Sequence, residues 1–172
     1  MPGKDGRRSR GRPLYSAAER RRRDASPWTV VQGVLAPLQF LVFLASAALV
    51  LRYLATGQGL GPATLSVVLK TGILYLIMVT GSIWEHDVFG KWLFAPAFFW
   101  EDVVSMLVLA LHTAYLVTLF GGLLEPRGQM LVALAAYAAY LVNAGQFLWK
   151  LRRARLEGGS SESPLAVAEA AG

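Results

Sequence analysis

Four carboxyl side chains lie close together in the sequence between two long apolar stretches, namely Glu85, Asp87, Glu101 and Asp102. Paired carboxyl groups can act as general acid and general base when burial and a like-charged neighbour keep one protonated near neutral pH. Because Glu101 and Asp102 are adjacent, we expect only one to face inward, and helical spacing with His112 favours Glu101. The alternative role of Asp102 is to complement the positive end of a helix. Asp87 is expected to be solvated.

Further polar side chains follow helical spacing within the apolar stretches. His112 lies eleven residues after Glu101, which places it ~16 Å along a helix and near the middle of a bilayer. Gln39 lies at a similar depth in the first stretch. Helical spacing places Glu101, Ser105, His112 and Tyr115 on one face of the third stretch, and Asn143, Gln146 and Lys150 on one face of the last one. Polar groups at such depths are costly and tend to mark functional sites. The alternatives are amides that only hydrogen-bond between helices and a histidine that is only packed.

The elements that must position these groups are four apolar helices. Hydrophobic residues make up 55% of the 172 residues and charged residues 16%, whereas a soluble domain carries about a quarter. A helix needs about 20 apolar residues to cross a bilayer, and four stretches qualify, at about 28–51, 63–84, 101–120 and 130–149. The sequence therefore predicts an all-α integral membrane bundle over 27–156, in which Lys70 extends to the outer interface. Residues 1–26 are expected to form a basic cytoplasmic tail in which a short surface helix is possible, and residues 157–172 a disordered tail.

The basic residues indicate how the bundle is oriented. Most of the 17 Lys and Arg residues lie in the two tails, and basic segments favour the cytoplasmic side. Both termini and the acidic stretch at 84–100 are therefore expected in the cytoplasm. The run Arg20 to Arg23 flanks a span, so attraction to anionic lipid explains it better than nucleic-acid binding.

Several cofactors are excluded by residue types. The chain has no cysteine, which excludes thiolate nucleophiles, cysteine-bound iron–sulfur clusters and covalently attached haem. A bis-histidine haem needs two histidines on facing spans, yet His86 lies at the end of a span and only His112 lies within one. No zinc-type ligand spacing occurs, so no metal site is expected. On the residues alone, a non-catalytic pigment- or quinone-binding membrane subunit ranks first, and a small assembly or scaffold protein is a further alternative.

Longer motifs nevertheless resemble a known enzyme family. They are WE at 84–85, VFG at 88–90, LFAPAFFWEDV at 93–103, LHTAY at 111–115, LAPLQF at 35–40 and NAGQFLWK at 143–150. Together they resemble the 3-vinyl (bacterio)chlorophyllide hydratases of anoxygenic phototrophs, also called 2-vinyl bacteriochlorophyllide hydratases. The similarity is nearly continuous over about residues 12–156.

The resemblance implies an activity. The family adds water to the C3-vinyl group of chlorophyllide a or 3-vinyl bacteriochlorophyllide a, giving a 3-(1-hydroxyethyl) product in bacteriochlorophyll a biosynthesis. It implies a multi-pass protein of the bacterial inner membrane, cytoplasmic or intracytoplasmic, with no cofactor beyond the substrate's own magnesium. The expected partners are a chlorophyllide-type tetrapyrrole, the lipid bilayer, and a further copy of the chain or neighbouring pigment-biosynthesis enzymes.

This chemistry assigns roles to the candidate residues. A general acid must protonate the terminal vinyl carbon before water, helped by a base, attacks the other carbon. We expect Glu101 as acid and Glu85 or Asp102 as base. The residues expected to bind substrate or orient water are His112, Gln39, Asn143, Gln146, Trp100, His86 and Lys91. Of these, His112 is expected to ligate the magnesium or hydrogen-bond the pigment. The substrate's propionate is expected to meet Lys91 or one of two further basic residues, Lys150 and Arg152.

Overall fold

The computed structural model describes residues 14–159, with side chains through Arg153, and the regular secondary structure of this part is all helical. The helices are α1 (Ala17–Ala25), α2 (Pro27–Thr56), α3 (Leu60–Phe89), α4 (Phe99–Phe120) and α5 (Pro126–Gly159). No strand occurs within residues 14–159. The prediction of an all-α protein is confirmed. The expected tails fall largely on 1–13 and 160–172, outside the described residues, while 157–159 continue α5.

Four of these helices are long and apolar enough to cross a membrane, which confirms the four-span prediction. Large apolar side chains remain exposed along them, for example Val30, Leu65, Leu107 and Leu148. Such exposure suits contact with lipid, where a helix satisfies its backbone hydrogen bonds internally. The helices extend beyond the apolar cores of the spans, so α3 continues through residues 84–89 and includes the first part of the acidic stretch.

The short helix α1 begins at the capping box that the sequence contains. Ser16 Oγ accepts from the Glu19 N–H at 3.2 Å, and the Glu19 carboxylate accepts from the Ser16 N–H at 2.7 Å. Tyr15, just before this helix, stacks on Phe89 at a centroid distance of 5.8 Å. The Arg23 guanidinium lies 4.9 Å from the centre of the Tyr15 ring. These contacts attach α1 to the end of α3.

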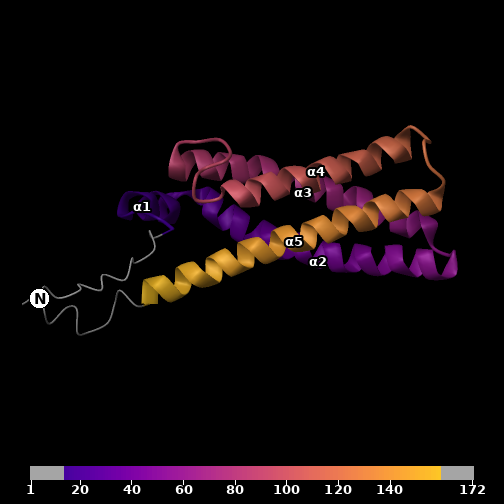
Figure 1. Cartoon of the computed structure of the whole chain (residues 1–172), viewed down its shortest axis with the longest axis horizontal. Helices are drawn as coiled ribbons and strands as arrows, with labels where there is room; N and C mark the ends of the chain where they lie inside the picture. The colour runs from indigo at the N-terminus through magenta and orange to yellow at the C-terminus, as the bar shows by residue number, and fades with distance from the viewer. Residues whose placement is uncertain (1–13, 160–172) are drawn as a thin grey trace, which may run out of the picture.

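The spanning helices pack as two antiparallel pairs, α2 with α3 and α4 with α5. Fewer contacts join the pairs, through α2–α5, α3–α4 and α3–α5, and we call this surface the interpair seam. The α2–α3 and α4–α5 connections lie at one end of the molecule (Figure 1). Helix α1, the segment 90–98 and the last turns of α5 lie toward the other end, where the carboxyl groups are found.

One expectation about the spans is wrong. Lys70 does not reach an interface, because its side chain is fully buried. Helix α3 already begins at Leu60, so Lys70 lies ten residues and ~15 Å into it. Its Nζ atom faces α5, 3.9 Å from the centre of the Tyr140 ring.

Candidate active site

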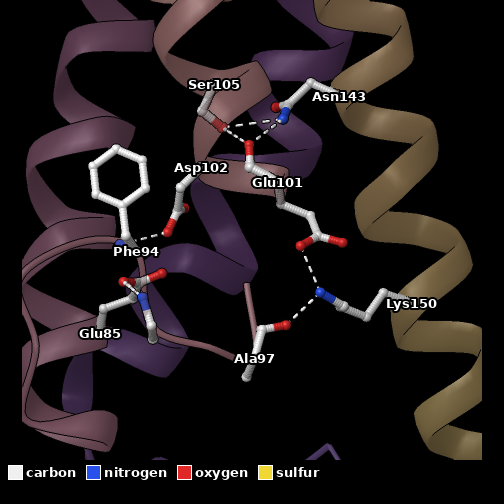
Figure 2. Close-up of polar contacts among 9 residues, drawn as sticks. Glu85, Phe94, Ala97, Glu101, Asp102, Ser105, Asn143 and Lys150 are labelled. Carbon is white, nitrogen blue, oxygen red and sulfur yellow. Dashed lines mark hydrogen bonds and ion pairs between the residues drawn. The ribbon is translucent and has the colours of Figure 1, made fainter. Parts of the chain in front are cut away.

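The segment 90–98 folds back over the ends of α3 and α4 and holds two carboxyl groups (Figure 2). The Phe94 N–H donates to Asp102 Oδ2 at 2.8 Å, and the Ala95 N–H donates to Glu85 Oε2 at 3.3 Å. Phe94 has a φ of 59°, which is uncommon for a residue with a side chain and turns its N–H toward α4. Consecutive N–H groups in such a conformation form an anion-binding concavity. The segment thus acts as a backbone clamp on the carboxyl pair.

The two clamped carboxyl groups come from different helix pairs. Glu85 ends α3 and is 4% exposed, while Asp102 lies in the first turn of α4 and is 6% exposed. The two carboxyl groups are close enough to interact electrostatically. Because a carboxylate can only accept, a hydrogen bond between two carboxyl groups requires one proton between them. The pair therefore offers a place for a transferable proton at the interpair seam.

Glu101 points away from that pair and is held from α5. Its Oε2 atom forms an ion pair with Lys150 Nζ at 2.5 Å, and Lys150 also donates to the Ala97 carbonyl oxygen. The Glu101 backbone oxygen accepts from Asn143 Nδ2 at 2.9 Å, and the same amide donates to Ser105 Oγ at 3.0 Å. Glu101 is only 6% exposed. Lys150 thus holds the Glu101 carboxylate, and Asn143, seven residues earlier in α5, holds the backbone of the same residue.

The expectation that only one of Glu101 and Asp102 faces inward is wrong, since both are buried. Adjacent helical positions do point in different directions. Here each direction is covered, because the segment 90–98 encloses Asp102 and Lys150 of α5 encloses Glu101. The first turn of α4 therefore presents two carboxyl groups to two different environments.

Other predicted residues lie farther away. His112 is fully buried, and its Nδ1 atom is 2.8 Å from the Val108 carbonyl oxygen, which can only accept. Its Nε2 atom has no hydrogen-bond partner among the described residues, and the same holds for Gln39 Oε1 on α2 and Gln146 Oε1 on α5. His112 remains ~16 Å along α4 from Glu101. Gln39 and His112 therefore belong to a deeper level than the carboxyl groups.

Three predicted binding residues lie on the exposed surface. Trp100 is 68% exposed, Lys91 is exposed, and the exposed ring of His86 stacks on Trp92 at a centroid distance of 4.3 Å. The structure does not bring them together with the buried carboxyl groups. Sequence reasoning missed the backbone clamp from Phe94 and Ala95, for which no side-chain pattern exists. It also missed the pairing of Lys150 with Glu101, although the Asn143, Gln146 and Lys150 spacing pointed to that face.

The assembled groups suit proton transfer. They comprise a carboxyl pair at the interpair seam, a separate carboxylate bound to an ammonium, and amides on the neighbouring helix. Within residues 14–159, no group of three or more metal-ligating side chains could hold a metal ion. The arrangement can donate a proton at one point and accept one at another.

Comparisons with known proteins relate the chain to one enzyme family. The family model of 2-vinyl bacteriochlorophyllide hydratase (BCHF) matches residues 15–153. The chain is 66% identical over 147 residues to the 2-vinyl bacteriochlorophyllide hydratase of Cereibacter sphaeroides, covering 85% of this chain and 91% of that protein. It is 61% identical over 157 residues to the protein of the same name from Rhodobacter capsulatus, covering 91% of each. No solved structure matches the chain. The chain belongs to the 2-vinyl bacteriochlorophyllide hydratase family.

Proposed function

We propose that this protein adds water to the C3-vinyl group of chlorophyllide a or 3-vinyl bacteriochlorophyllide a. The product is the 3-(1-hydroxyethyl) pigment on the route to bacteriochlorophyll a. Family membership names the reaction. The observation in the fold that supports it is the buried pair Glu85 and Asp102, because vinyl hydration begins with a proton donor in a water-poor site.

The first step is protonation of the terminal vinyl carbon. The Glu85–Asp102 pair supplies the proton, and a new C–H bond forms as the vinyl π bond is broken. Two carboxyl groups in contact favour sharing one proton over carrying two charges, as in the aspartic proteases. The positive charge that results lies on the carbon beside the macrocycle, whose π system delocalises it.

The second step is the attack of water on that carbon. We assign Glu101 as the base, which reverses the role expected from sequence. Its carboxylate is bound to the Lys150 ammonium and is therefore suited to accept a proton rather than to supply one. Asn143 and Gln146 line the same face of α5 and orient the water. The carbinol C–O bond forms, the water proton passes to Glu101, and a proton then returns to the carboxyl pair.

This reaction needs no oxidant, reductant or additional cofactor, because the product equals the substrate plus one water molecule. The magnesium is part of the substrate. A ring whose magnesium is ligated by His112 could not also place its vinyl group at Glu101, since the ~16 Å rise exceeds the fixed metal-to-vinyl distance. We therefore propose that His112 and Gln39 contact the part of the pigment remote from the vinyl group.

The site is proposed to face the cytoplasm of a bacterial inner membrane. The carboxyl groups belong to the end of α3 and the start of α4, at the end of the bundle that carries α1 and the end of α5 (Figure 1). Basic residues concentrate at that end, as they do on cytoplasmic sides. A pigment with an apolar ring would reach the interpair seam from the bilayer.

The test is hydration of chlorophyllide a by membranes containing the full chain. In water enriched in ¹⁸O, we expect the product to carry one ¹⁸O atom in the hydroxyethyl group by mass spectrometry, with the matching change in absorption. Membranes from the Cereibacter sphaeroides relative serve as the positive control. Pigment binding without any labelled product, where the relative is active, would instead support the non-catalytic pigment-binding alternative.

A further inference from the structure

Lys70 is the least expected residue inside the spans. It is fully buried on α3, and its Nζ atom has no hydrogen-bond partner among the described residues. A charged group in the bilayer interior is costly unless it is paired, and such residues mark sites where a charged ligand is bound or moved. A lysine needed only for packing could be replaced by methionine at little cost, because the two side chains have similar length.

The surroundings of Lys70 suit a cation but contain no anion in the described structure. Its Nζ atom lies 3.9 Å from the centre of the Tyr140 ring and 5.9 Å from that of Tyr137. Aromatic faces attract a cation, but they only partly replace a carboxylate. The Tyr137 hydroxyl is already hydrogen-bonded to Ser46 at 2.5 Å. His112 also packs at this level, with its ring centre 5.8 Å from that of Tyr137.

We propose that the Lys70 ammonium binds the propionate carboxylate of the tetrapyrrole while the vinyl group lies at the Glu85–Asp102 pair. This inference rests on the proposed function and identifies the class of ligand that binds at the level of Lys70, Tyr137 and Tyr140. The ligand is a flat apolar ring with one free carboxylate on its edge. The ring lies along the interpair seam, and its carboxylate is the anion that Lys70 otherwise lacks.

The distance between the level of Lys70 and the level of the carboxyl groups fits such a ligand. Tyr140, which contacts Lys70, lies ten residues before Lys150, which holds Glu101. The two levels are therefore ~15 Å apart along α5, while Lys70 and Glu85 are ~22 Å apart along α3, so their side chains must extend toward the ligand to cover the difference. A tetrapyrrole carries its vinyl and propionate groups on different rings, and the propionate arm adds reach. The ligand can thus span from one level to the other, whereas a small anion could not.

The position of Lys70 at the interpair seam also supports the inference. Lys70 belongs to the α2–α3 pair and faces Tyr137 and Tyr140 of the α4–α5 pair. Glu85 and Asp102 meet across the same seam nearer the other end. Because the pairs share fewer contacts with each other than within themselves, a flat ring can part them at the lowest cost. Both polar levels then face the inserted ring.

The cationic side chains near the carboxyl groups are less suited to this role. Lys150 is occupied by Glu101 and the Ala97 carbonyl oxygen. Lys91 and Arg152 are exposed, where water and salt weaken an ion pair. A propionate at the surface remains the competing position, and the experiment separates the two.

The experiment compares binding of chlorophyllide a and its propionate methyl ester to the full chain in nanodiscs, by quenching of intrinsic tryptophan fluorescence. We expect the wild-type chain to bind the free acid about 10- to 100-fold more tightly than the ester, as expected for a charge-assisted hydrogen bond. Lys70→Met should remove this preference and leave ester binding unchanged. Lys70→Arg should retain part of it, and Arg52→Met, at an exposed position of α2, should retain all of it.

Three results would overturn the inference. Equal wild-type affinity for acid and ester does so without any variant, so a poorly folded Lys70→Met protein does not block the test. Loss of acid and ester binding together in a folded Lys70→Met protein would show a structural role. Loss of the preference in Lys91→Met instead would place the propionate at the surface. Affinity is read from the initial quenching, before product accumulates, so failure of hydration leaves this result standing. Active hydration with an unchanged preference in Lys70→Met refutes the inference alone.

Discussion

The proposed mechanism requires Glu85 and Asp102 to share one proton, so replacing either carboxyl group should strongly slow hydration. Replacing Glu85 by Gln keeps the size of the side chain and an oxygen that can accept from the Ala95 N–H. That hydrogen bond is long, at 3.3 Å, so we expect the substitution to cost on the order of 1 kcal/mol of stability or less. The protein should therefore insert and fold, while the amide cannot donate a proton to carbon.

The expected kinetic effect follows from the role of a general acid. Removing such a group lowers kcat by roughly 10²- to 10⁴-fold, and Asp102→Asn should have an effect of the same size. If one proton is shared, either substitution removes it, so the double variant should be no slower than the slower single variant. Two independent groups would instead multiply their effects.

The assay is the rate of hydroxyethyl product formation in membranes, with protein amounts matched by quantitative immunoblotting. Asp87→Asn is the matched control, because Asp87 lies two residues from Glu85 but is exposed and accepts only from Ser26 at 2.9 Å in the described contacts. It should retain nearly full activity. Retention of more than a tenth of wild-type kcat in Glu85→Gln, or multiplied losses in the double variant, would refute a shared proton on this pair.

Lys150→Met removes the partner of the buried Glu101 carboxylate. Because the lysine side chain is 23% exposed, we expect the free energy of unfolding to fall by about 2–3 kcal/mol, less than the full cost of breaking a buried ion pair. The measurement is the Tm in detergent, with Lys150→Arg as the control. Phe94→Gly should match or raise the Tm, since glycine adopts a φ of 59° without the cost of about 1–2 kcal/mol that a side chain carries there; a clear loss of stability would contradict strain at this position. Because the chain has no cysteine, a single introduced cysteine reports on which side of the membrane it lies. An impermeant maleimide should label Glu125→Cys in intact cells and Lys91→Cys only after lysis. The reverse labelling pattern would show that the topology is inverted.

Helical spacing predicted one face of the site correctly. Glu101, Ser105, His112 and Tyr115 were expected on one side of a helix, and all four are buried on α4. A helix in lipid keeps its backbone hydrogen bonds internal, so little besides the position in the sequence determines which side chains share a face. The same reasoning placed Asn143 and Lys150 together on α5.

The positions of Asp102 and Lys70 depend on tertiary contacts that leave no periodic pattern in the sequence. Asp102 is buried because Phe94, a residue with a side chain, adopts a positive φ and points its N–H at the carboxylate. Propensity rules would have placed a glycine there. Lys70 was expected at an interface because a long cationic side chain can usually extend to water. It remains inside because two tyrosine rings on α5 lie against its ammonium group, and only the packing of distant helices brings them there.

The two helix pairs each contribute carboxyl groups to the site, so insertion of the pigment between them affects those groups differently. Glu101 and Lys150 both belong to the α4–α5 pair, so a ring that parts the two pairs leaves their ion pair intact. Glu85 and Asp102 belong to different pairs and meet only across the interpair seam. A ring inserted there must loosen the contact between these two carboxyl groups and bring the vinyl group toward the proton they share. On the proposed mechanism, pigment binding and release of the proton are then one movement, which keeps the acid from being lost to water before the substrate arrives.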